Sequence, residues 1–151
     1  MSKNRSKTDG ILIAAIVISY IIYSVFWMRA ALVQVNLDKT TATELIEQFT
    51  KESMIRNICE LCVYILFLIR CWNTWDGAVE RRCVTYLLET SKIILSVLVL
   101  GGIFTAIQYF MIGLFWGNYL MPVVILMGIT VAMLLLTSGI QAKTDITKEK
   151  Y

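Results

Sequence analysis

The chain contains no histidine and only one proline among its 151 residues. Histidine is the most common metal-ligating side chain and the one that most readily exchanges protons near neutral pH. Its absence excludes Ser-His-Asp triads and zinc sites of the His-Glu-x-x-His type. We therefore expect no metal, no cofactor and no enzymatic activity.

Charged residues are also scarce. They make up 17% of the chain, against roughly 25% in an ordinary soluble domain, whereas 58% of the residues are hydrophobic. This balance is typical of integral membrane proteins, with the lipid bilayer as the main partner. The net charge of +3 does not indicate a nucleic-acid partner, and four cysteines are too few for a disulfide scaffold.

A membrane span needs roughly 20 mostly apolar residues, and four segments of the sequence approach this requirement. The predicted spans are residues 10–33, 54–72, 93–116 and 119–140. The segment 54–72 is the least apolar of the four because it contains charged residues. We interpret the first segment as an uncleaved span, since its apolar run is long and no good cleavage site follows it.

The basic residues predict how these spans are oriented. Ten of the 14 lysines and arginines lie before the first span, between the second and third, or after the fourth, and four lie on the opposite side. Basic residues concentrate on the cytoplasmic side of membrane proteins. The sequence therefore predicts an all-α, single-domain, four-helix transmembrane bundle over residues 1–151, with both termini cytoplasmic.

Two features of the connections refine this prediction. Thr41 and Glu44 fit a capping box, so a helix should begin near Ala42. This helix either continues into the second span or first lies on the outer surface. Gly117 and Asn118 leave a very short connection, which predicts an antiparallel hairpin of the third and fourth spans.

The second span carries charges inside an apolar segment. Glu52, Arg56 and Glu60 lie on one helix face, and a charge within the bilayer costs about 3 kcal/mol or more unless it is paired. Gln108 on the third span is predicted to lie at the same depth in the membrane as Glu60, so we expect it to be the partner of Glu60. We interpret Arg56, Glu60 and Gln108 as an intramembrane polar network that fixes helix packing. The alternative is an ion- or proton-coupled site centred on Glu60.

Cys59 and Cys62 flank this glutamate in a Cys-x-x-Cys motif. Such a motif near the outer face of a four-helix membrane protein is similar to that of the vitamin K epoxide reductase family, which implies thiol redox chemistry. That chemistry needs a stabilised thiolate, and the neighbouring Glu60 opposes one. The other cysteines, Cys71 and Cys83, are expected near the cytoplasmic face, too far from this motif to relay electrons directly.

The inner loop WDGAVERRCVTYLLETSKII and the tail SGIQAKTDITKEKY carry a further resemblance. In length, topology and loop pattern the chain resembles the YoaS-like family of small four-span bacterial membrane proteins of unknown function. The resemblance implies a multi-pass protein of the bacterial plasma membrane with a regulatory role, and it implies no catalytic residues.

These observations favour a non-enzymatic accessory, regulatory or immunity-type role through contacts of helices and loops with a second copy or another membrane protein. The second hypothesis is a small ion- or proton-coupled transporter or channel subunit that uses Glu60. The third is a membrane thiol oxidoreductase that uses Cys59 and Cys62.

Overall fold

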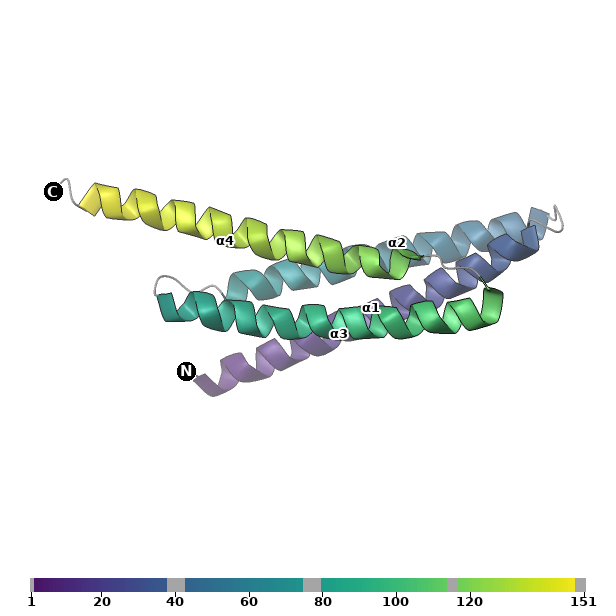
Figure 1. Cartoon of the computed structure of the whole chain (residues 1–151), viewed down its shortest axis with the longest axis horizontal. Helices are drawn as coiled ribbons and strands as arrows, with labels where there is room; N and C mark the ends of the chain where they lie inside the picture. The colour runs from purple at the N-terminus through teal and green to yellow at the C-terminus, as the bar shows by residue number, and fades with distance from the viewer. Residues whose placement is uncertain (1, 38–42, 75–79, 114–116, 149–151) are drawn as a thin grey trace.

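The computed structural model describes residues 2–37, 43–74, 80–113 and 117–148, and this part of the chain is helical except at Gly113. Four long α-helices lie along one common direction (Figure 1). A 3-10 helix, η1, leads into the last of them. The helices are α1 (Ser2–Leu37), α2 (Thr43–Thr74), α3 (Glu80–Ile112), η1 (Gly117–Leu120) and α4 (Met121–Lys148).

Successive helices run in opposite directions, so the N-terminus and the C-terminus lie at the same end of the bundle (Figure 1). We call this the proximal end and the opposite one the distal end. The most extensive contact is between α1 and α2, and α1 also packs on α3. Helix α4 packs on α3 and α2, and its axis diverges from the other helices toward the proximal end (Figure 1).

Each predicted span coincides with one of these helices, apart from residues 114–116, which lie outside the described part of the chain. The helix expected near Ala42 is described from Thr43 and continues without a break into the second predicted span. The surface-lying alternative for this segment is therefore wrong. The predicted Gly117–Asn118 hairpin lies at η1, and Gly113 ends α3 with a φ of 74°, its N–H donating to the Tyr109 carbonyl at 2.8 Å.

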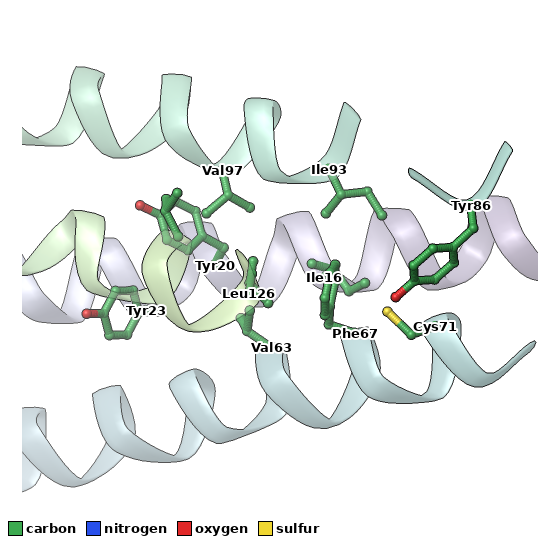
Figure 2. Packing of buried hydrophobic residues seen from close by; sticks show 11 residues of the cluster. Ile16, Tyr20, Tyr23, Val63, Phe67, Cys71, Tyr86, Ile93, Val97 and Leu126 are labelled. Atoms are coloured by element: carbon green, nitrogen blue, oxygen red, sulfur yellow. The ribbon is translucent and has the colours of Figure 1, made fainter. Parts of the chain in front are cut away.

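A narrow apolar core runs along the centre of the bundle. Most of its buried side chains are aliphatic, and Tyr20 and Tyr23 stand toward one end of it while Cys71 and Tyr86 stand at the other (Figure 2). Figure 2 shows the central part of this core: Ile16, Val63, Phe67, Ile93, Val97 and Leu126.

Large apolar side chains also cover the outside of all four α-helices. The exposed ones include Ile18, Ile65, Phe110 and Val131, and Phe110 is 86% exposed. Two helical segments, Thr8–Asn36 and Val84–Ile112, are long and apolar enough to cross a membrane. In the apolar 18-residue window of each segment only 22% is buried, whereas the core helix of a soluble protein would be mostly buried. In α4, residues 121–136 form a shorter apolar segment.

Gly101 of α3 is the described glycine at which an added side chain would meet its neighbours most closely. A Cβ atom at this position would lie 2.6 Å from the Tyr20 hydroxyl and 3.2 Å from the Tyr119 carbonyl oxygen. The same hydroxyl donates a hydrogen bond of 2.7 Å to that carbonyl. Glycine at position 101 thus allows α1, α3 and η1 to meet at one point, whereas a Cβ at Gly102 would have no atom within 4 Å.

This difference gives a matched pair of variants. We expect Gly101→Ala to destabilise the protein by about 1 to 3 kcal/mol, because the added methyl overpacks the junction and displaces the Tyr20 hydroxyl. Gly102→Ala should be neutral or stabilising, since alanine is the better helix former. Thermal unfolding of the purified protein in detergent measures both effects. Equal melting temperatures for the two variants would contradict the close approach.

Candidate functional site

Arg70 of α2 is the largest fully buried side chain in the described structure. Its Nε lies 2.9 Å from Oδ1 of Asp9 on α1, and its Nη2 donates a hydrogen bond of 3.3 Å to Oδ2 of the same carboxylate. The Nη2 atom also lies 3.8 Å from Oε2 of Glu89 on α3, and Lys92 bonds the other oxygen of Glu89 at 2.6 Å. We call these four residues the proximal layer, which ties three helices together.

A second set of charges lies at the distal end. Nη2 of Arg29 on α1 lies 2.7 Å from Oε1 of Glu52 on α2, and the Glu52 side chain is only 7% exposed. One turn further along α2, the Arg56 guanidinium lies over the Trp27 ring at 4.2 Å from its centroid, a cation–π contact. Arg29, Glu52, Arg56 and Trp27 form the distal layer, which joins α1 to α2.

The separation of the two layers matches the thickness of a bilayer core. Twenty residues separate Asp9 from Arg29 on α1, which is about 30 Å at 1.5 Å per residue. Eighteen residues separate Glu52 from Arg70 on α2, or about 27 Å. The hydrocarbon core of a bilayer is about 30 Å thick.

Glu60 lies between these layers. Ten residues separate it from Arg70 and eight from Glu52, which places it about 15 Å and 12 Å from them along the helix. Its Oε1 accepts a hydrogen bond of 2.7 Å from the Tyr64 hydroxyl, one turn along the same helix. Glu60 also interacts electrostatically with Tyr23 of α1. Arg56, its expected partner within the helix, contacts Trp27 and Asn57 instead.

Gln108 is buried on α3, with 1% of its surface exposed. Nineteen residues separate it from Glu89 of the proximal layer, so it stands at about 28 Å, close to the distal layer. Neither its amide oxygen nor its amide nitrogen has a hydrogen-bond partner in the described part of the chain. The structure therefore does not bring Gln108 and Glu60 into a hydrogen bond.

Aromatic rings connect the helices in the distal half of the bundle. Tyr20 lies beside Tyr23, Tyr23 beside Trp27, and Trp27 beside Tyr119 of η1, with ring centroids 5.8, 6.5 and 6.3 Å apart. Tyr119 in turn stacks on Phe104 of α3 at 6.1 Å. Because Tyr20 also donates to the Tyr119 carbonyl, four of these residues close a ring of contacts between α1 and η1. We call the five residues the aromatic cluster.

None of the described cysteines is a member of the two layers or of the aromatic cluster. Cys59 is half-buried and Cys62 is exposed on α2, and both are free thiols. Cys71 is a free, buried thiol beside Arg70, and the Tyr86 hydroxyl points toward its sulfur (Figure 2). The described residues contain no group of three or more histidine, cysteine, aspartate or glutamate side chains arranged to hold a metal ion. Cys83 lies where side chains are not described.

Comparison of the chain with models of known protein families, with curated proteins and with solved structures gives no match. The site is therefore defined by its own geometry: two charged layers about one bilayer thickness apart, a carboxylate midway between them, and an aromatic cluster in the distal half.

The proximal layer gives a prediction about buried charge. Asp9→Asn should destabilise the protein by about 3 kcal/mol, because it leaves a buried guanidinium without its main partner. Arg70→Met should cost less, since Asp9 is 36% exposed and can be hydrated, and methionine fits an apolar site. The double variant should recover most of the loss caused by Asp9→Asn. Thermal unfolding of the three variants measures this order.

Lys92 provides the control, since its side chain is 68% exposed and contacts only Glu89 of the proximal layer. Lys92→Met should change stability by no more than about 0.5 kcal/mol. If Asp9→Asn were as mild as Lys92→Met, the Arg70–Asp9 pair would not hold the helices together.

Proposed function

We propose that the chain is an integral protein of the bacterial plasma membrane, crossing the bilayer four times with both termini in the cytoplasm. We further propose that it acts as a non-enzymatic accessory, regulatory or immunity-type protein, by contacts with a second copy or another membrane protein. The observation that carries this proposal is the belt of exposed apolar side chains on all four α-helices between the two charged layers. Such a surface is favourable against lipid and unfavourable against water.

The charged layers support four crossings rather than two. Helix α2 is the least apolar helix because of Glu52, Arg56, Glu60 and Arg70. Three of these four charges are held by other helices of the bundle: Glu52 by Arg29, Arg56 by Trp27, and Arg70 by Asp9 and Glu89. Paired in this way, the charges cost far less in a bilayer than isolated ones. Helix α2 can therefore cross as part of the bundle although it would be a poor span alone.

The same contacts support a non-enzymatic role. The charged side chains inside the bundle contact other groups of the same chain and fix the packing of α1, α2 and α3. The outer faces of the helices are then free to contact lipid or another membrane protein. The resemblance to the YoaS-like proteins favours a regulatory role of this kind.

Topology is tested by labelling single cysteines in a background without the native ones. We expect Lys51→Cys, at an exposed position near the distal layer, to react with a membrane-impermeant maleimide in intact cells. Ser91→Cys, at an exposed position near the proximal layer, should react only after the membrane is permeabilised. Labelling of both positions in intact cells would mean that α2 does not cross the membrane.

A second candidate function is ion- or proton-coupled transport through Glu60. It is favoured by the position of this carboxylate near the middle of the apolar belt, where ionisable residues are rare and usually functional. Glu60 has a hydrogen bond from Tyr64 but no ion pair in the described part of the chain.

Glu60→Gln separates the two functions. In a strain that lacks the gene, we expect the Glu60→Gln protein to restore the wild-type phenotype, because the amide still accepts the Tyr64 hydrogen bond and the contact surfaces are unchanged. Tyr64→Phe is the matched control for the hydrogen bond alone. Loss of complementation by Glu60→Gln, at normal membrane abundance and with Tyr64→Phe active, would reject the accessory role in favour of transport.

A further inference from the structure

Buried polar atoms without partners are concentrated in the distal half of the bundle. They belong to four elements, α1, α2, α3 and η1. The atoms are Trp27 Nε1, Glu52 Oε2, Ser53 Oγ, the amide oxygen and nitrogen of Gln108, and the Tyr119 hydroxyl. The hydroxyl of Ser24, also fully buried, lies beside the Tyr20 phenol in the same region.

The other half of the interior differs sharply. Between Glu60 and the proximal layer the core cluster is built mainly from aliphatic and aromatic side chains, among them Ile16, Phe67 and Ile93 (Figure 2). The buried Thr130 hydroxyl of α4 donates to the Leu126 carbonyl of its own helix at 2.8 Å. At the proximal end, Arg70 and Tyr86 both have polar partners. One buried hydroxyl at this end, that of Thr90, has no hydrogen-bond partner in the described residues. Most of the buried polar atoms without partners, but not all of them, therefore lie in the distal half.

Such an arrangement is costly in a dry interior. A buried donor or acceptor without a partner costs about 1 to 3 kcal/mol, and native proteins satisfy more than about nine-tenths of such groups with protein or water. Gln108 alone offers two donors and an acceptor at 1% exposure. Six such atoms on four elements point to a polar ligand that reaches them from the distal end.

We propose that the distal half of the bundle interior opens into a vestibule that admits water and small hydrophilic solutes from the distal side as far as Glu60. The described structure shows this vestibule closed, because Ser24, Gln108 and Tyr119 have almost no exposed surface. Its walls carry the aromatic cluster, Ser24 and Gln108, and Glu52 and Ser53 lie at its mouth. Its floor is Glu60 with Tyr64 and Tyr23. The apolar core from Ile16 to Phe67 and the proximal layer close it toward the other end.

The vestibule gives Glu60 contact with one side of the membrane only. With both termini in the cytoplasm, as proposed above, that side is the exterior. A carboxylate midway through the bilayer is then in contact with the outer solution. The apolar core from Ile16 to Phe67, which we call the plug, separates it from the cytoplasm. The proposal goes beyond the accessory role and holds whichever of the two functions the protein has.

Two positions on α1 test the proposal directly. Ser24 and Ile16 are both fully buried and lie eight residues apart. Ser24→Cys places a nearly isosteric thiol in the vestibule. Ile16→Cys places a thiol smaller than the native side chain in the plug. The purified single-cysteine proteins are placed in lipid nanodiscs, which expose both membrane faces, and treated with a charged methanethiosulfonate reagent. Lys51→Cys serves as the exposed reference, and the result does not depend on the topology of the protein in cells.

We expect Ser24→Cys to react at least about 100-fold faster than Ile16→Cys, because thiol reactivity follows access to the reagent. Similar slow rates at both positions would show a dry bundle and overturn the vestibule. Similar fast rates would show that no plug exists and would overturn it as well. A failure of the topology labelling with a normal Ser24→Cys rate would reject the orientation and leave the vestibule in place.

Gln108→Leu is an independent measurement that needs no reactive thiol. If the amide is hydrated, leucine should leave the melting temperature in nanodiscs unchanged or lower it. The amide then has water as its partner, so replacing it removes no unsatisfied group and places an apolar side chain among hydrated ones. If the amide is dry and without a partner, leucine should raise the melting temperature by several degrees, since an unsatisfied buried group is removed. A rise of that size would overturn the proposal.

Discussion

The contact between Arg70 and Asp9 determines how the helices of this bundle can associate. A guanidinium with no exposed surface cannot remain without a partner in an apolar interior, so α1 and α2 must pair in the one register that brings Asp9 to it. That register also brings Arg29 to Glu52 at the other end. Apolar contacts alone would specify the register weakly, because one row of aliphatic side chains packs on another in several offsets.

The fourth helix shows what happens without such a contact. No described residue of α4 takes part in either charged layer, and α4 joins the bundle by apolar packing and, through η1, by the Tyr20–Tyr119 hydrogen bond. It stays close to the others near this bond and diverges from them toward the proximal end (Figure 1). The charged layers thus tie α1, α2 and α3 together, whereas α4 is held by packing on α3 and α2 and by the contact at η1.

The sequence predicts the helices well because length and composition are local properties. All four expected spans coincide with helices, and two helical segments are long and apolar enough to cross a membrane. It predicts the partners of polar residues poorly. In the sequence, Arg70 lies at the edge of a predicted span, but in the structure it is fully buried. The sequence does contain a signal for its partner. Asp9 and Arg29 on α1 are separated by nearly as many residues as Glu52 and Arg70 on α2. Depth within the predicted spans pairs Gln108 with Glu60, whereas the ion pairs of the structure place Gln108 close to the distal layer.

The unequal distribution of polar groups along the bundle then has a physical meaning. A bundle selected only for stability would fill both halves with aliphatic side chains, as this one does between Glu60 and Arg70. In the distal half, tyrosine, tryptophan, serine and glutamine occupy core positions instead, and several of their polar atoms have no partner in the chain. The apolar half and the proximal layer compensate for the stability lost by placing these polar side chains in the core. Such a division is expected when one end of a bundle maintains the fold and the other receives something polar from outside it.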